Sequence, residues 1–289
     1  MAQRNRVRLD ARSLFEFWSR LGEGFVHPDD REHLRPGDFA TELHPVPWAG
    51  PIETADVYLL YLNPGYSPHD LPYEQTRQDF VALLRDNLAG GAPYFYLLDR
   101  FADHPGHAWA SRALGKDITQ DDLRRICVLQ IVPYHSKGGA VARRAARRRL
   151  PSSEAIRAFV QQAVLPAARR GEVGLIVARS ALLWGVSAAD ESPNVVVYRR
   201  AECRGAFVTP KTRGGALLRR WLSNPDARAR DCIESVGTLR DRQTADEDEA
   251  AQRQHLGVAD RGDGSQRRRG PFRPARRCMD GEPVLDESG

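Results

Sequence analysis

The sequence predicts an α/β domain with a central, mostly parallel four-stranded sheet and helices on both of its faces. Four short runs are almost entirely apolar, which is typical of strands that are buried on both sides. Amphipathic helix patterns alternate with these runs, and such alternation produces a parallel sheet. The four predicted strands are Asp56–Leu62, Ile126–Val132, Gly174–Ala178 and Asn194–Tyr198.

The helices between the strands are predicted from apolar residues that recur with helical spacing. Residues Glu74–Leu88 and Ser152–Arg170 each place their apolar side chains on one stripe, so both ranges are expected to be amphipathic helices. Shorter patterns predict a helix over Leu14–Leu21, a capping box at Thr119–Asp122 and a helix after Gly214-Gly215.

Length and composition suggest one folded domain followed by a polar tail. The chain has 289 residues and a net charge of +5. We expect residues 1–240 to form the domain, with an N-terminal helical extension. Residues 241–289 alternate acidic and basic side chains with few aliphatic ones, so this tail is predicted to be disordered.

Several classes of protein are disfavoured by what the sequence lacks. It has no apolar stretch of membrane-spanning length and no secretory signal pattern, so we expect a cytoplasmic protein. Its four cysteines are far apart and His104 and His107 flank a Pro-Gly pair, so neither a metal nor a cofactor is expected. Phosphate-loop, dinucleotide-binding and hydrolase-elbow motifs are also missing.

Two of the predicted strand ends carry polar residues that suggest a site. In α/β sheets ligands bind at the carboxyl ends of the strands. Asn63-Pro64-Gly65 follows the first strand, where an ordinary turn is the alternative interpretation. Gln130 is an amide within an apolar run, and it needs a protein or ligand partner because burying an unpaired amide costs about 1–3 kcal/mol.

At these residues the chain resembles the uracil-DNA glycosylase superfamily. Leu62-Asn63-Pro64-Gly65 is similar to the first motif of the mismatch-specific branch, which implies that Asn63 positions the attacking water. The strand ending in Gln130 resembles the second motif, which implies that this amide reads the flipped pyrimidine. Thr209-Pro210-Lys211-Thr212 falls where the third motif would lie, but it lacks that motif's His or Asn. The resemblance implies no cofactor.

Further substrate contacts are expected around the same loops. His135 is placed to hydrogen-bond the leaving base or a phosphate, with a purely structural histidine as the alternative. Gly65 stands where the uracil-specific branch has an aromatic residue, so a substituent at the pyrimidine 5-position is not excluded there. The candidates for stacking on the base are Tyr66, Tyr73, Phe80 and Tyr134, although core packing is the more common role of an aromatic residue.

A run of arginines follows the second strand end and predicts contact with DNA. It contains no acidic residue, and phosphate contacts offset the cost of extruding a base. The alternative is a solvated helical face. The predicted DNA-binding residues are Arg143, Arg144, Arg147 and Arg148 in this run, with Thr209, Lys211 and Arg213 near the third motif.

These observations predict a monofunctional DNA glycosylase that removes a flipped, 5-substituted pyrimidine from double-stranded DNA. The chain also resembles an anti-phage DNA glycosylase that removes glucosylated hydroxymethylcytosine, which implies phage DNA as a target and a role in antiviral defence. Two alternatives stay open: housekeeping DNA repair of uracil or mismatched thymine, and a non-catalytic nucleic-acid-binding relative. The family resemblance implies a monomer.

Overall fold

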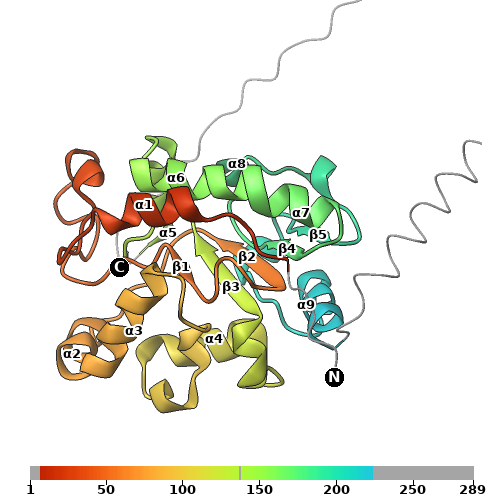
Figure 1. Ribbon diagram of the computed structural model, residues 1–289, viewed down its shortest axis with the longest axis horizontal. Helices are drawn as coiled ribbons and strands as arrows, with labels where there is room; N and C mark the ends of the chain where they lie inside the picture. Colours follow the sequence, from red (N-terminus) through yellow and green to blue (C-terminus); the bar gives the residue numbers. More distant parts are fainter. Residues whose placement is uncertain (1–6, 137, 224–289) are drawn as a thin grey trace, which may run out of the picture. The chain divides into compact units, whose positions relative to one another are not determined.

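Five strands form one mixed sheet in the computed structural model, which describes residues 7–136 and 138–223 (Figure 1). The strand order is β1-β3-β2-β4-β5, in which β2 to β5 are mutually parallel and β1 is antiparallel to β3. The α/β class is therefore confirmed, whereas the prediction of four strands is wrong by one edge strand. The strands are β1 (Trp48–Ala49), β2 (Val57–Tyr61), β3 (Ile126–Gln130), β4 (Gly174–Val177) and β5 (Val195–Val197).

The unpredicted strand β1 is too short to show a strand pattern and is formed by tertiary contacts. Asn87 holds it through Nδ2, which donates to Trp48 O at 2.6 Å, and through Oδ1, which accepts from Gly50 N. Trp48 Nε1 donates in return to Asn87 O. Gly50 has φ +114°, and a Cβ there would lie 2.2 Å from Ile126 O, so only glycine allows β1 to pack beside β3.

Both faces of the sheet are covered, as the continuous apolar runs predict. Alternate residues of β2 point to opposite sides: Tyr58 and Leu60 join one core cluster, and Val57 and Leu59 join the other. Figure 1 shows α1, α6 and α7 on one side of the sheet and α2, α3 and α4 on the other.

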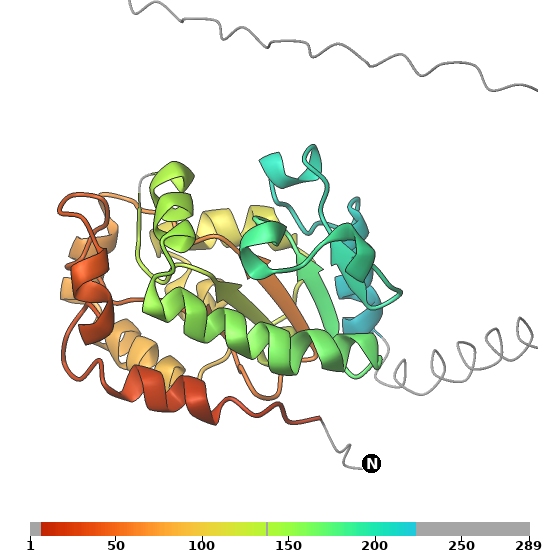
Figure 2. The ribbon, with the colours of Figure 1, turned by 90° about the horizontal axis from the view of Figure 1, so that it is seen from above.

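The predicted helices are present except in one place, whereas the helices Pro105–Leu114 and Ala181–Trp184 were not predicted. The predicted helix Ser152–Arg170 is an uninterrupted rod of α6, a π-helical turn η5 (Val160–Val164) and α7 (Figure 2). The α-helices are α1 (Arg12–Ser19), α2 (Asp70–Thr76), α3 (Gln78–Leu88), α4 (Pro105–Leu114), α5 (Gly139–Arg147), α6 (Pro151–Phe159), α7 (Leu165–Arg169), α8 (Ala181–Trp184) and α9 (Arg213–Ser223). Short 3-10 helices are η1 (Pro28–His33), η2 (Phe95–Leu97), η3 (Asp99–Phe101), η4 (Asp121–Arg124), η6 (Ala188–Asp190) and η7 (Glu202–Arg204).

The prediction of a single helix over Glu74–Leu88 is wrong, because the backbone leaves the helical region at Arg77 (φ −109°, ψ 77°). The guanidinium of Arg77 pairs with Asp79 and Asp103, which favours the break. The resulting short helix α2 begins at Asp70, shortly after the loop that follows β2.

The described residues fall within one of two units of the chain, Met1–Thr238. The expected tail, residues 241–289, lies outside the described residues. In the part of the chain that the structure describes, none of the helices has the length and apolar character needed to cross a bilayer.

Candidate functional site

A cavity of about 380 Å³ lies at the carboxyl ends of β2, β3 and β4. The loop after β2 lines it with residues 62–67, and β3 and its following loop contribute Gln130, His135 and Ser136. Arg179 comes from the end of β4. The cavity therefore brings together Asn63, Gly65, Tyr66, Gln130 and His135, which the sequence analysis selected from two separate segments.

The Asn63 side chain is held by its amino group. Nδ2 donates to Pro64 O at 2.6 Å and to Ser136 Oγ at 2.9 Å, with a longer contact of 3.5 Å to Tyr134 O. Two of these acceptors are backbone carbonyls, so only the amino group can face them. Asn63 Oδ1 makes no hydrogen bond to a described residue, which leaves an acceptor available for a donor such as water.

Gln130 is the last residue of β3, and its side chain lacks the partner that the sequence analysis required. The residue is 5% exposed and lines the cavity. Its Oε1 is buried without a hydrogen bond to any described residue. An unsatisfied buried acceptor of this kind costs about 1–3 kcal/mol, so a ligand that donates a hydrogen bond here recovers that free energy.

His135 is a neutral imidazole in the wall of the cavity. Burial lowers its pKa below the ordinary value of 6.5. Nδ1 lies 2.7 Å from Gly65 O, so Nδ1 carries the proton and donates to this carbonyl. Nε2 is then an acceptor, and it is buried without a hydrogen bond to a described residue. His135 therefore supports the loop after β2 and leaves an unsatisfied acceptor.

Gly65 and Tyr66, in the loop after β2, also line the cavity. A Cβ built on Gly65 meets no atom within 4 Å, so the space beside this residue is open. Tyr66 is partly buried and lines the cavity. Both residues line the cavity, and contact of either residue with a base stays a prediction.

Tyr134 does not line the cavity, although the sequence analysis grouped it with the base-binding residues. It is 1% exposed and belongs to the core cluster that also contains Tyr58 and Leu60. Its hydroxyl donates to Asp30 Oδ2 at 2.6 Å, and Asp30 Oδ1 accepts from Ser152 N. Tyr134 and Asp30 thereby connect η1 to the start of α6.

The four predicted DNA-binding arginines, three on α5 and Arg148 at its C-cap, form an exposed face beside the cavity. Arg143, Arg144, Arg147 and Arg148 are all exposed, while Ala142, Ala145 and Ala146 of the same helix are buried. Gly139, the first residue of α5, lines the cavity. Of the four, Arg144 has a long ion pair of 3.7 Å with Asp38. The position and exposure suit contact with a polyanion.

The three candidates near the third motif lie away from the cavity lining. Lys211 is exposed, and Thr209 O accepts from Thr212 N in the turn that starts α9. Arg213 has a structural role, because its guanidinium pairs with Glu191 and Glu202 and donates to Val197 O. Arg213 therefore anchors α9 to the segment around β5, and the structure gives it no free donor set for DNA.

Five charged or aromatic cavity residues that lie outside β2, β3 and the loops after these strands were not selected from the sequence. Two are charged: Asp70 at the start of α2, and Arg179, whose Nε is buried without a partner and whose amino group donates to Arg204 O. A signal existed for Arg179, which directly follows a predicted strand. The others, Tyr96, His104 and Trp109, come from segments far from any strand end, so no local pattern indicated them.

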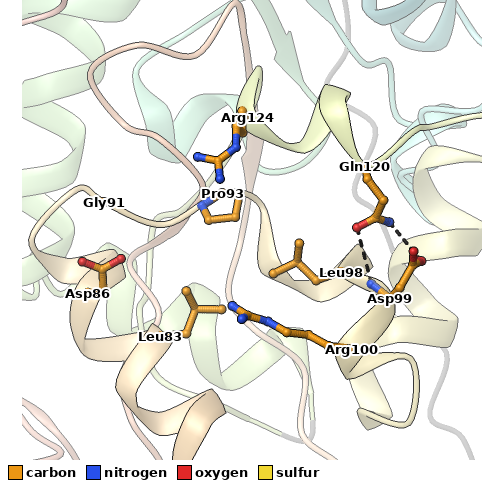
Figure 3. Close-up of a pocket in the computed structure, with 9 residues that line it drawn as sticks. All are labelled: Leu83, Asp86, Gly91, Pro93, Leu98, Asp99, Arg100, Gln120 and Arg124. Carbon is orange, nitrogen blue, oxygen red and sulfur yellow. Dashed lines mark hydrogen bonds between the residues drawn. The ribbon is translucent and has the colours of Figure 1, made fainter.

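A second, more open hollow of about 500 Å³ lies beyond the amino end of β3 (Figure 3). Two arginines and two aspartates line it, so these charges cancel. Gln120 and Asp99 already satisfy each other through two hydrogen bonds. None of its lining side chains has a buried unpartnered polar atom within the described residues. The cavity around Gln130 is therefore the better candidate site.

Comparison of the chain with protein-family models, curated proteins and solved structures found no match. Among residues 7–136 and 138–223, no group of three or more His, Cys, Asp or Glu side chains is arranged to hold a metal ion.

Proposed function

We propose that the chain is a monofunctional DNA glycosylase that hydrolyses the N-glycosidic bond of a flipped, 5-substituted pyrimidine and leaves an abasic site. The observation that carries this proposal is the unpartnered Oε1 of Gln130, buried in the cavity that also contains Asn63. A carboxamide both donates and accepts, and it matches the edge of a pyrimidine that offers both kinds of group.

Asn63 supplies the second requirement of this chemistry, a positioned water. Its Nδ2 is occupied by protein acceptors, so Oδ1 accepts a hydrogen bond from water and orients the oxygen lone pair toward the sugar. An amide does not titrate near neutral pH, so Asn63 positions this water without deprotonating it. A weakly activated water is sufficient when the sugar in the transition state is already cationic.

The space beside Gly65 supports a substituted base. No atom lies within 4 Å of a Cβ built at this position, so the wall does not close against the pyrimidine 5-position. The cavity volume of about 380 Å³ lies within the range of about 300–1,000 Å³ usual for small-molecule pockets. Glucosylated hydroxymethylcytosine of phage DNA belongs to this substrate class, and its removal would serve antiviral defence.

Double-stranded DNA is the proposed partner, bound by a monomer. The exposed face of α5 adds four arginines beside the cavity, and no acidic residue occurs in this helix. Phosphate contacts of this kind offset the few kcal/mol needed to extrude a base. Arg213 is left out of the proposed DNA contacts because its guanidinium is ion-paired with Glu191 and Glu202, whereas Thr209 and Lys211 stay predictions.

The test uses matched duplexes that contain uracil, thymine opposite guanine, 5-hydroxymethylcytosine or its glucosylated form. After incubation with protein, alkali converts abasic sites into strand breaks. We expect breaks with a 5-substituted cytosine, reduced about 100-fold or more in Asn63→Ala because the water loses its positioning group. Gln162→Ala, which changes an exposed amide, is the control. Breaks only with uracil or thymine would indicate the housekeeping repair function instead.

One observation favours a non-catalytic nucleic-acid-binding relative. The residues at the expected third motif do not line the cavity, so that motif provides no group for the departing base. In that case no substrate would be cleaved, and salt-sensitive binding to DNA would be equal in wild type and Asn63→Ala.

A further inference from the structure

Asp70 is a buried carboxylate in the cavity wall to which the sequence analysis assigned no role. It is the first residue of α2 and is 6% exposed. It lines the same cavity as Asn63 and Gln130. Among the described residues that line this cavity, Asp70 is the only one with a carboxylate side chain.

One oxygen of Asp70 is anchored and the other is available. Oδ2 accepts a hydrogen bond of 2.6 Å from Ser67 N, and Ser67 O accepts from Asp70 N at 3.0 Å. This reciprocal turn fixes the carboxylate next to the loop that carries Asn63. Oδ1 makes no hydrogen bond to a described residue. Because Oδ2 is held by Ser67 N, Oδ1 is an acceptor with a fixed direction.

The neighbouring carboxylate, Glu74, is not available in this way. Its Oε2 accepts from His44 Nδ1 at 2.6 Å and from His44 N at 3.2 Å, and Glu74 does not line the cavity. Asp70 is therefore the carboxylate that can interact with a bound molecule.

The surroundings compensate the charge of Asp70 only in part. Burial raises its pKa, and the negative charge of Glu74 on the same helix acts in the same direction. The Ser67 N–H favours the ionised form by its hydrogen bond, and His135 and His69 do so only when they are protonated. Tyr96, which faces Asp70 from η2, is neutral because burial raises its own pKa. A cationic group placed in the cavity would therefore be stabilised by Asp70.

We propose that Asp70 is a catalytic carboxylate that stabilises the cationic sugar and accepts the proton of the attacking water; this inference rests on the glycosylase function proposed above. The water oxygen forms a bond to C1′ of the sugar while the C1′–N bond breaks. The electron pair of the broken bond leaves with the base, and a water proton passes to Asp70. Release of that proton to the departing base or to solvent restores the carboxylate.

The experiment measures charge recognition separately from base excision. Two duplexes differ only at one position, which holds either a cationic pyrrolidine analogue of an abasic site or the neutral tetrahydrofuran analogue. Dissociation constants are measured between pH about 5 and about 8 for wild type, Asp70→Asn, Asp70→Glu and Asp121→Asn. Asp121 is exposed and lies outside the cavity, so Asp121→Asn is the matched control.

We expect wild type and Asp121→Asn to bind the cationic duplex at least about tenfold more tightly than the neutral one. The preference for the cationic duplex falls as Asp70 is protonated at low pH. It is lost in Asp70→Asn and partly retained in Asp70→Glu. Thermal unfolding of Asp70→Asn checks that the variant is folded. Equal preference in wild type and Asp70→Asn, or no preference in wild type, would overturn the inference.

Base excision distinguishes this failure from failure of the proposed function. Strand breaks that form at the same rate in wild type and Asp70→Asn would overturn the role of Asp70 and leave the glycosylase function standing. A charge preference that depends on Asp70, without strand breaks on any substrate, would support the cation site and overturn the glycosylase proposal.

Discussion

Asn63 Nδ2 donates a hydrogen bond of 2.9 Å to Ser136 Oγ, and this contact joins the loops that follow β2 and β3. Ser136 Oγ donates in turn to Gly138 O at 3.1 Å, one residue before α5 begins. Asn63, the proposed water-positioning residue, is thus linked through Ser136 to the N-terminus of α5, the helix that carries the arginines. Ser136 orients Asn63 by accepting from the amino group, which leaves Asn63 Oδ1 directed away from the protein acceptors.

Ser136→Ala is therefore expected to reduce excision without unfolding the protein. Loss of one hydrogen bond lowers the free energy of unfolding by about 1 kcal/mol. A less well oriented Asn63 lowers the single-turnover excision rate about tenfold. Ser19→Ala, which removes an exposed hydroxyl bonded only within α1, is the control. A wild-type rate in Ser136→Ala would show that this contact does not position Asn63.

Gln130→Met is expected to stabilise the protein while abolishing base recognition. Methionine has a similar length and no polar atom, so the unsatisfied Oε1 disappears from the wall. We expect the free energy of unfolding to rise by about 1 kcal/mol, measured by chemical denaturation. The control is Gln162→Met at an exposed position, where little change is expected. A loss of stability in Gln130→Met would mean that the carboxamide has a structural partner.

Stability is expected to fall with acid because His104 is buried as a neutral imidazole. Burial lowers its pKa from 6.5 to about 4, and Nδ1 accepts from Gly106 N at the start of α4. As the pH falls below 6.5, His104 in the unfolded chain binds a proton, whereas the folded one stays neutral down to about 4. As the pH falls from 6.5 to about 4, the unfolded state is therefore stabilised by about 3 kcal/mol relative to the folded state.

His104→Asn tests this dependence, because asparagine keeps an acceptor at the helix start but does not titrate. Urea denaturation at pH about 7, 5.5 and 4 is expected to show a smaller loss of stability with acid in the variant than in wild type. His135, whose pKa is also lowered by burial, accounts for part of the loss that persists. An equal loss of stability with acid in the two proteins would refute the assignment to His104.

Replacement of Arg143 and Arg147 by Gln is expected to weaken duplex binding uniformly across sequences. Each lost phosphate contact reduces the slope of log K against log salt by about one, so the double variant should lose about two. The matched control replaces Arg100 and Arg124, which are exposed and line the second hollow instead of the cavity. An unchanged salt slope in the α5 variant would place the DNA contact elsewhere.

Local sequence patterns were sufficient for the four parallel strands and most of the helices. Val57–Tyr61 and Ile126–Gln130 are continuous apolar runs because both faces of these strands are buried. The same reasoning located Asn63 and Gln130, since parallel strands bring their carboxyl ends to one edge of the sheet. The buried amide of Gln130 was predicted to need a partner, and in the structure its Oε1 has none among the described residues.

The remaining features depend on contacts between residues that are distant in sequence. Strand β1 has two residues and is held by Asn87, so no period within it could predict pairing. Tyr134 was a candidate for stacking on the base, but it is buried in the core, where its hydroxyl donates to Asp30.

The α/β class and the two strand ends at which Asn63 and Gln130 lie can be predicted from short runs of apolar residues, because such runs form strands that are buried on both faces. Contacts between separate segments place Asp70 and Arg179 in one cavity, pair Arg213 with acidic residues and expose the arginines of α5 beside the cavity. The charge of the site and its unsatisfied groups depend on this packing, so no short segment of the sequence reveals them.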